Sequence, residues 1–259
     1  MLSPSRLRQL NALLLPFVLV FAITAFPQTK HPTHTPPRPI TIANDASSEP
    51  HHKLIFENAK TRIFRVDLPA AASTETHTHT RDYIRIAITN ISARNEFDKS
   101  KSKTDSNAIT MAPGEMEVIK VPQTAKLVNV GDAPLTLLEV EIPAGFHPDL
   151  IVCGLGKRSC PSDVGDISDP AHIFSLNFLF ETDAVRAFDI TVGPGAELPT
   201  RLAKDDFVRI AITPLDLTIG GTQSTKMNPG DVQWSKAGDL PKFINNANEE
   251  ARFYEIEFK

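Results

Sequence analysis

The sequence has no excess of basic charge, because 27 lysines and arginines stand against 31 aspartates and glutamates among its 259 residues. A net charge of −4 gives no positive field for a phosphate backbone, so we expect no nucleic-acid partner. No run of like charge suggests contact with a membrane surface. The chain also has no convincing helical stripe of apolar residues, and this absence argues against an α-helical or mixed fold.

Cysteine is scarce as well, since Cys153 and Cys160 are the only two in the chain. With six residues between them, they do not have the spacing of a two-residue redox motif or a zinc knuckle. Gly154 and Gly156 lie in the intervening segment, which suits a small closed loop. In an oxidising compartment this pair predicts a disulfide.

The sequence lacks a long uninterrupted apolar run, even near its beginning. Arg6 and Arg8 precede an apolar stretch over residues 10–26 that Pro16 interrupts. This stretch is shorter than the ~20 apolar residues of a typical spanning helix. We therefore predict a secretory signal peptide over residues 1–26 and an exported protein, periplasmic or secreted, with an uncleaved membrane anchor as the alternative.

The segment after the predicted signal peptide has no apolar periodicity. Residues 27–53 are rich in Pro, Thr, Ser and His, which predicts a disordered spacer. We expect its histidines, His51 and His52 among them, to be solvated residues of this spacer rather than metal ligands.

What the sequence does contain from Leu54 onward is a series of short β-rich runs, separated by Pro, Gly and Asn. This pattern predicts an all-β fold. We expect the polar segment Asn90–Ala108 to be an exposed loop. The runs in the first part are 62–68, 83–89, 115–121, 125–130 and 134–142.

The second feature present is an internal repeat. Residues 56–89 match residues 180–213 at 12 of 34 positions, and a Met-x-Pro-Gly turn recurs at Met111 and Met227. A repeat of this length predicts a duplicated domain. We assign residues 54–142 to repeat 1, 143–174 to a connecting segment with the cysteine pair, and 175–259 to a degenerate repeat 2.

One pair of histidines distinguishes the two copies. His77 and His79 stand in the first copy, where the second has Arg201 and Ala203. Because residues two apart in a strand point to the same face, both imidazoles can bind one ion. Two imidazoles form a weak site, so we expect a third ligand. The candidates are Glu75, Asp82 and Tyr83, and further along the chain Glu117 and Glu139.

The following strand carries an arginine on the same face as the histidines if it runs unbroken. Arg85 suits a carboxylate or phosphate ligand. Arg209 occupies the same place in the other copy, which favours a shared structural role such as pairing with a Glu on a neighbouring strand. The opposite face presents Ile84, Ile86 and Ile88, a candidate row for packing between the two repeats.

A duplicated β unit with this His-x-His, a Pro-Gly turn and an Asn-x-Gly turn resembles the cupin superfamily, and in particular a bicupin. The resemblance implies two tandem double-stranded β-helix (jelly-roll) barrels in one chain. The family pattern has a Glu where Tyr83 stands and a third His where Ala125 stands, so half of one metal site is matched. The resemblance implies a divalent ion (Mn, Fe, Cu, Ni or Zn) and places Arg85 and Lys126 near it.

Three functions follow from these observations. The first is a metal-dependent enzyme whose N-terminal repeat is active. The second is a binding module for a small polar or anionic ligand, and the third is a metal-free structural protein in which the His pair forms hydrogen bonds. A homo-oligomer is compatible with each. The sequence predicts no specific reaction.

Overall fold

The computed structural model describes residues 44–97, 107–121, 123–142, 153–155, 167–168 and 173–259. In this part the chain consists of strands and one short 3-10 helix, η1 (Ala46–Ser48). The prediction of an all-β fold is confirmed. None of the helical structure in these ranges is long and apolar enough to cross a membrane. The predicted signal peptide lies outside the described residues.

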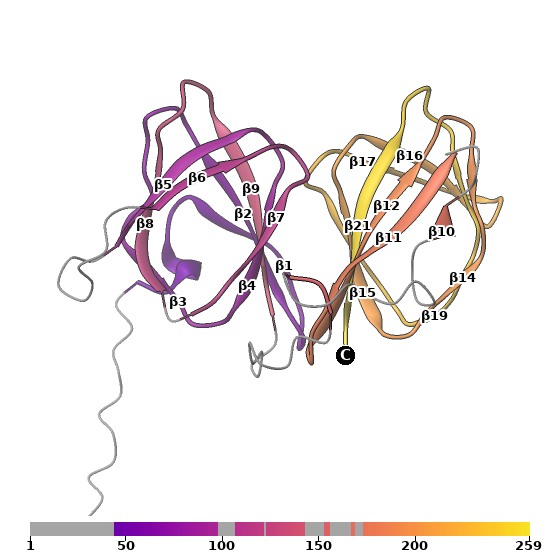
Figure 1. Ribbon diagram of the computed structural model, residues 1–259, viewed down its shortest axis with the longest axis horizontal. Coiled ribbons are helices and arrows are strands. Elements are labelled where there is room, and N and C mark those ends of the chain that lie inside the picture. The colour runs from indigo at the N-terminus through magenta and orange to yellow at the C-terminus, as the bar shows by residue number, and fades with distance from the viewer. Residues whose placement is uncertain (1–43, 98–106, 122, 143–152, 156–166, 169–172) are drawn as a thin grey trace, which may run out of the picture. The chain divides into compact units, whose positions relative to one another are not determined.

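In the N-terminal half, the described strands pair with one another in two sheets (Figure 1). The five-stranded sheet has the order β1-β2-β9-β4-β7, and the four-stranded sheet has the order β3-β8-β5-β6. The strands are β1 (His52–Glu57), β2 (Arg62–Leu68), β3 (His77–His79), β4 (Tyr83–Ala87), β5 (Ile91–Phe97), β6 (Asn107–Met111), β7 (Met116–Ile119), β8 (Gln123–Asn129) and β9 (Leu135–Glu141).

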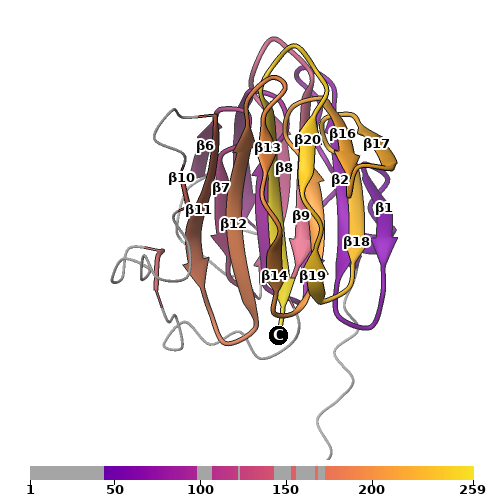
Figure 2. The ribbon, with the colours of Figure 1, turned by 90° about the vertical axis from the view of Figure 1, so that its right-hand side faces the viewer.

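The C-terminal half repeats this plan, and Figure 2 faces its strands. Its sheets have the orders β10-β11-β12-β21-β15-β18, β13-β20-β16-β17 and β14-β19. The strands are β10 (Ile167–Ser168), β11 (Phe174–Glu181), β12 (Val185–Val192), β13 (Glu197–Leu198), β14 (Arg201–Ala203), β15 (Asp206–Ala211), β16 (Leu215–Ile219), β17 (Gln223–Met227), β18 (Val232–Ser235), β19 (Gly238–Leu240), β20 (Phe243–Asn245) and β21 (Ala251–Phe258).

The alternation of side chains along β4 separates the core from the site. Ile84, Ile86 and Ile88 belong to an apolar cluster that also contains Val208 and Ile210 of the other half. The predicted packing of this isoleucine row between the repeats is confirmed. Residues on the opposite face of β4 therefore point into the N-terminal half, and this is where the candidate site lies.

A second feature common to both halves is a buried asparagine at the end of a strand. The Asn129 side-chain amide donates to the carbonyls of Leu68, Pro69 and Ala133. The Asn245 amide makes the same three kinds of contact in the C-terminal half. These hydrogen bonds tie the Asn-x-Gly and equivalent turns to neighbouring strand ends, which explains why both copies contain the residue.

The Met-x-Pro-Gly turns lie where the halves meet. Gly114 and Gly230 have φ angles of 79° and 86°, a backbone conformation that favours glycine. A Cβ on Gly114 would lie 2.6 Å from Nη1 of Arg252 in the other half, and a Cβ on Gly230 would lie 2.8 Å from Nη1 of Arg65. The positive φ angle therefore accounts for the glycine in both turns, and an arginine side chain of the other half packs against each.

Two sequence assignments need correction. The composition predicts a disordered spacer up to residue 53, but residues 44–53 contain η1 and the first residues of β1, and Ala46, Glu49 and His52 are buried. The expected loop Asn90–Ala108 contains β5 and the start of β6. Pairing with other strands supplies the order in both cases, which local composition does not reveal: residues 44–53 contact β3 and pair with β2, and β5 pairs with β8.

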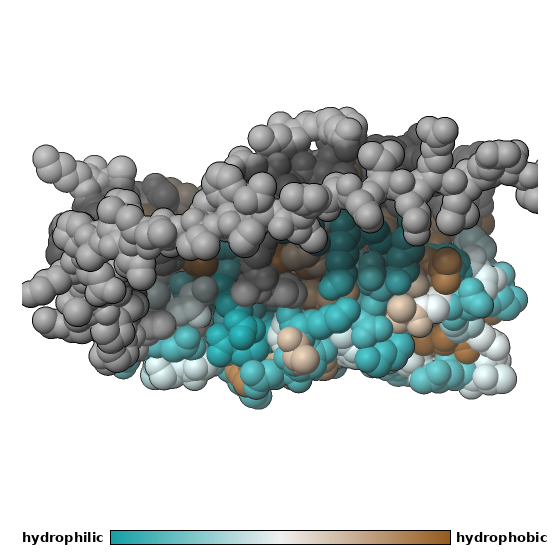
Figure 3. All heavy atoms as spheres, turned by 90° about the horizontal axis from the view of Figure 1, so that it is seen from below, coloured by the Kyte–Doolittle hydropathy of each residue, from teal (hydrophilic) through white to brown (hydrophobic). Residues whose placement is uncertain are grey.

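The face of the molecule in Figure 3 is mostly hydrophilic where its residues are described, with apolar side chains scattered over it. The exposed large apolar residues of the described part lie on separate elements. They are Leu54, Val130, Leu155, Ile173 and Leu202. Scattered apolar residues of this kind are normal on a protein surface and mark no docking patch.

Candidate metal centre

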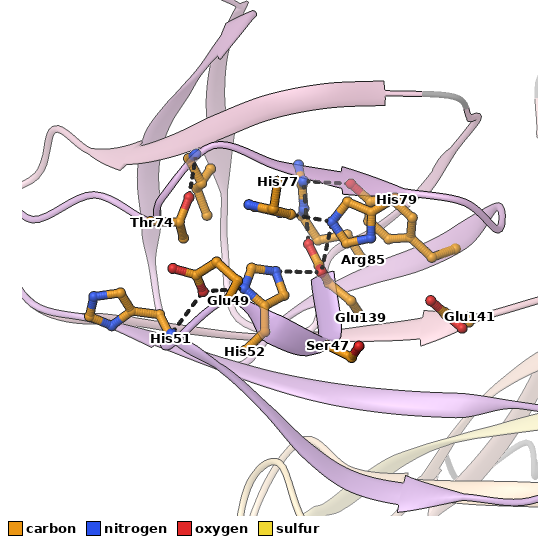
Figure 4. A network of polar contacts seen from close by, with 12 residues as sticks. Ser47, Glu49, His51, His52, Thr74, His77, His79, Arg85, Glu139 and Glu141 are labelled. Atoms are coloured by element: carbon orange, nitrogen blue, oxygen red, sulfur yellow. Dashed lines mark hydrogen bonds and ion pairs between the residues drawn. The ribbon is translucent and has the colours of Figure 1, made fainter. Parts of the chain in front are cut away.

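Three histidines converge inside the N-terminal half (Figure 4). His77 and His79 lie on β3, and their side chains share a face because of the two-residue strand period. His52 is the first residue of β1. One nitrogen from each of the three side chains lies within 4.8 Å of the others, and all three residues are buried.

The spacing of the imidazoles suits a shared ion. Nε2 of His77 lies 3.0 Å from Nε2 of His79. Two nitrogens bound at about 2.1 Å to one ion are separated by about 3.0 Å at a right angle and by about 3.4 Å at a tetrahedral angle. The observed separation is that of a hydrogen bond between the two rings, and it is also short enough for both nitrogens to bind one ion.

A carboxylate completes the cluster. Oε2 of Glu139, on β9, lies 3.1 Å from Nε2 of His52 and 3.5 Å from Nε2 of His79. Its other oxygen, Oε1, lies 3.6 Å from Nη2 of Arg85. Glu139 thus offers a fourth donor atom between two of the imidazoles.

Two of the histidines form a hydrogen bond through Nδ1, the ring nitrogen that faces away from the cluster. Nδ1 of His52 lies 2.6 Å from Oε2 of Glu49, and Nδ1 of His77 lies 2.9 Å from the carbonyl oxygen of Glu75. Both contacts leave Nε2 for the cluster, as is usual for imidazoles that bind metal. Nδ1 of His79 is buried and has no hydrogen-bond partner.

Arg85 and Tyr83 form the wall beside His79. The Tyr83 ring stacks on the His79 ring with a centroid distance of 4.3 Å, and its hydroxyl accepts a hydrogen bond of 3.0 Å from Nη2 of Arg85. Nη1 of Arg85 donates to Oε1 of Glu117 at 2.8 Å. Arg85 thus pairs with glutamates on both neighbouring strands, which is the structural role that its counterpart Arg209 suggested.

The three imidazoles differ in their affinity for a proton. Burial opposes a charge on His52, but Glu139 and Glu49 outweigh burial and raise its pKa to about 9. Burial, together with the positive charges of His77 and His52, lowers the pKa of His79 to about 4. Burial and the charge of His52 also lower the pKa of His77. At neutral pH, His77 and His79 are therefore neutral and ready to bind metal, whereas His52 carries a proton.

The carboxylates of the cluster stay ionised. Burial opposes the charge on Glu139, yet His79 and His52 hold its pKa below the usual range. The pKa of Glu49 falls to about 2 in spite of burial, because His52 and backbone N–H groups donate to its carboxylate. Two buried negative charges therefore face the imidazoles.

The space between these groups has the size of one ion. The cavity measures about 10 Å³ and is lined by the three histidines together with Tyr83, Arg85, Asn95, Ala125, Leu127 and Glu139. A volume of this size is close to the minimum for one water molecule. Three convergent imidazoles, a carboxylate and a space of one atom fit a divalent metal ion, but they leave no room for a larger molecule in this conformation.

Some of the predicted site residues lie at the cluster, and others do not. It brings together His77, His79, Tyr83 and Arg85. Glu75 is exposed and reaches the site only through its backbone, and the Asp82 carboxylate accepts the backbone N–H of Val121. Lys126 points to the other side of β8, where its Nζ lies 3.1 Å from Oε2 of Glu96, so its assignment to the site needs correction.

Sequence reasoning missed His52 as a site residue and left Glu139 as one of several open candidates. Glu139 had a usable signal, because Glu255 stands at its place in the second copy and both lie opposite an arginine. His52 had none, since the residues before it are polar and its position beside the β3 histidines arises only in the folded chain. Its role depends on the pairing of β1 with β2.

Only part of the predicted disulfide can be placed. Cys153 is buried and forms an isolated backbone bridge with Glu181. Cys160 lies outside the described residues. The disulfide therefore stays a prediction.

The C-terminal half has arginine where the N-terminal half has imidazole. Arg201 stands at the place of His77 and contacts Oε2 of Glu255, the counterpart of Glu139. Nη2 of Arg209 lies 2.7 Å from Oε1 of the same carboxylate. With Ala203 at the place of His79, this arrangement offers no imidazole to an ion.

Comparisons with known proteins identify the fold. No protein-family model and no curated protein matches the sequence. AerE from Microcystis aeruginosa is similar in structure, with a TM-score of 0.58 and 14% identity over 81% of this chain and 93% of AerE. A mutant of Bacillus subtilis oxalate decarboxylase has a TM-score of 0.53 and 14% identity over 76% of this chain and 68% of its own.

A third similar structure is a mutant of salicylate 1,2-dioxygenase from Pseudoaminobacter salicylatoxidans. Its TM-score is 0.51, with 12% identity over 76% of this chain and 71% of the dioxygenase. At such identities the likeness concerns the fold and not the activity. The chain has the cupin fold, as the resemblance predicted.

Proposed function

We propose that this protein binds one divalent transition-metal ion in its N-terminal half, through His52, His77, His79 and Glu139. The convergence of three buried imidazoles on a space of about 10 Å³ carries this proposal. Nitrogen donors with one carboxylate suit Mn, Fe, Cu, Ni or Zn. When bound, such an ion would polarise an oxygen ligand or activate a water molecule.

We propose a small carboxylate as the ligand class of this site. Arg85 is the cation that would receive it, since Arg85 lies beside the cluster and now pairs with the half-exposed side chain of Glu117. A small carboxylate could replace Glu117 at the guanidinium. The names of two similar structures, which mention oxalate and salicylate, support this class. Displacement of nearby groups is required, because the present cavity admits no such molecule.

Elemental analysis of the untagged protein tests the metal proposal. We expect about one ion per chain, lost in His52→Ala and in His77→Ala/His79→Ala. The matched control is His51→Ala, because His51 is adjacent in sequence but its Nδ1 contacts the carbonyl of Asp67 outside the cluster. Absence of bound metal after incubation with each of the five ions, with a melting temperature that EDTA leaves unchanged, would overturn the proposal.

A metal-free structural site is the second candidate, and the charges of the cluster favour it. A protonated His52 lies between the carboxylates of Glu49 and Glu139, and Arg85 supplies a second positive charge. The buried charges then balance without an ion. In this case His52→Ala would lower stability strongly in protein that had never bound metal, whereas the metal proposal requires that added ion raises the stability of the wild type.

We also propose that the protein is exported, on the basis of the signal-like residues 1–26. N-terminal sequencing of mature protein from its natural compartment tests this proposal. A start between residues 24 and 30 would support cleavage, while an intact N-terminus in the membrane fraction would support the anchor instead. The proposed Cys153–Cys160 disulfide is tested by thiol titration, since two free thiols in exported, unreduced protein would exclude it.

A further inference from the structure

The N-terminal segment before β1 lies directly against the metal-site strand. We define residues 44–52 as the strap. The N–H of Thr78, between the two histidines of β3, donates to the carbonyl of Asn44 at 2.8 Å, and Asp45 forms a parallel bridge with Thr78. The Asn44 amide reaches the carbonyl of Thr76 at 3.3 Å. The first two residues of the strap therefore bind the edge of β3 at Thr76 and Thr78, beside the two histidines.

Glu49 is the anchor of the strap. Its side chain is fully buried. Oε1 accepts the backbone N–H of Glu75 at 3.0 Å, while Oε2 accepts the N–H of His51 at 2.7 Å and lies 2.6 Å from Nδ1 of His52. A buried carboxylate with this many donors fixes both the position and the rotation of the His52 ring (Figure 4).

The backbone of one residue, Glu75, connects this anchor to a second ligand. The N–H of Glu75 donates to Glu49, and the carbonyl of Glu75 lies 2.9 Å from Nδ1 of His77. The orientations of His52 and His77 therefore depend on the same backbone segment. A displaced strap would lose the first ligand and loosen the support of the second.

The C-terminal half has an apolar residue at the place of His52. His52 pairs with Val66 in the β1–β2 ladder, and Leu176 pairs with Ile190, the equivalent of Val66, in the β11–β12 ladder. Leu176 is buried in an apolar cluster with Phe253. The fold itself thus needs no polar residue at this position, so the histidine serves the site of the N-terminal half.

We propose that the strap delivers the third metal ligand, His52, and its positioning residue, Glu49, so that ion binding and docking of the strap are one linked equilibrium. This inference rests on the proposed metal function. By reciprocity, the factor by which a docked strap strengthens ion binding equals the factor by which the ion favours docking. Loss of a carboxylate that orients a metal-binding imidazole typically weakens metal affinity about 10–100-fold.

The test measures both sides of this equilibrium on the full chain. Titration with Co²⁺ gives the affinity, and the visible spectrum of bound Co²⁺ reports the nitrogen ligands. Hydrogen exchange of the peptides that cover residues 44–52 and 74–80 reports docking. We expect Co²⁺ to slow exchange in both peptides of the wild type. We expect Glu49→Ala to weaken Co²⁺ binding about 10–100-fold, to change the spectrum and to remove the slowing.

Two further variants separate positioning from general damage. Glu49→Gln keeps the shape and an acceptor oxygen for Nδ1 of His52, so it should recover part of the affinity and the wild-type spectrum. Ser47→Ala changes an exposed residue of the strap and should behave like the wild type. Unchanged affinity in Glu49→Ala, or strap exchange that is unaffected by Co²⁺ in a wild type that binds it, would overturn the strap proposal alone. A wild type that binds no Co²⁺ or other tested ion would overturn the metal function and the strap proposal together.

Discussion

The two halves of the molecule place the same buried glutamate in front of different cations. Glu139 and Glu255 hold the same ladder position, each opposite an arginine of the neighbouring strand. In the C-terminal half Glu255 contacts Arg201, a permanent cation built into the chain. In the N-terminal half Glu139 faces His52 and His79, which can exchange a proton for a metal ion.

This difference indicates which parts of the repeat serve the fold. The arginine–glutamate pair occurs in both halves, with separations of 3.6 Å in Arg85–Glu139 and 2.7 Å in Arg209–Glu255, so it belongs to the architecture. The second positive charge near the glutamate is the variable element. In the C-terminal half this charge is the guanidinium of Arg201. In the N-terminal half it is a proton on His52, which a metal ion can replace.

The largest expected effect comes from giving the N-terminal half the residues of its counterpart. His77→Arg/His79→Ala should abolish ion binding completely, because a guanidinium pairs with Glu139 but does not bind metal. Elemental analysis checks the loss. The reverse change, Arg201→His/Ala203→His, should create no site, since Leu176 stands where His52 would be needed. Retention of a stoichiometric ion in the first variant would show that the ligands lie elsewhere.

The second prediction compares the two glutamates. Glu255→Gln should lower the free energy of unfolding by about 3–5 kcal/mol, because it leaves two buried arginines without their carboxylate. Glu139→Gln should cost less, since His52 can lose its proton whereas an arginine cannot. Urea unfolding of both variants at pH 8 without metal measures the difference. Equal losses would mean that the exchangeable proton of His52 makes no contribution.

The third prediction uses the raised pKa of His52. Its stabilising contribution is complete below its ordinary pKa of about 6.5 and is lost as pH rises through the folded value of about 9. For metal-free protein, this contribution is on the order of 3–4 kcal/mol, since the pKa rises by about 2.5 units and one unit corresponds to about 1.4 kcal/mol. Stability measured from pH 6 to pH 9.5 should fall more in the wild type than in His52→Gln.

The proton on His52 should make metal affinity rise with pH, whereas the stability of the metal-free protein falls. An ion that binds Nε2 of His52 must displace a proton, so affinity should rise with pH up to about 9, by up to about tenfold per unit. Calorimetry in buffers of different ionisation enthalpy would detect the released proton. Affinity independent of pH between 6.5 and 8.5 would exclude His52 as a ligand.

The smallest expected effect concerns a feature that the halves share. Asn129→Ala and Asn245→Ala should each cost about 1–3 kcal/mol, because each leaves buried carbonyls without a donor. Neither change should alter metal content. Thermal unfolding checks the similarity of the two losses, and a much larger loss in one half would show that the two turns are not equivalent.

Much of the fold could be predicted from the sequence. The run 62–68 coincides with β2, and the repeat gave the corresponding strands of the second half. The parity of β4 correctly placed Tyr83 and Arg85 on the face of the histidines. These predictions succeed because strand period and turn residues are local properties. The missed strands β1 and β5 are polar on part of their length, and pairing with β2 and β8 stabilises them.

The sequence by itself determined the all-β repeat, the location of the His-x-His pair and its absence from the second copy. Only the tertiary structure brought His52 and Glu49 from a segment of spacer-like composition to the edge of β3, placed Glu139 between the imidazoles, and turned Lys126 toward Glu96. The physical reason is that alternation along a strand is set by neighbouring residues. Which distant strand lies beside it depends on the packing of the whole sheet.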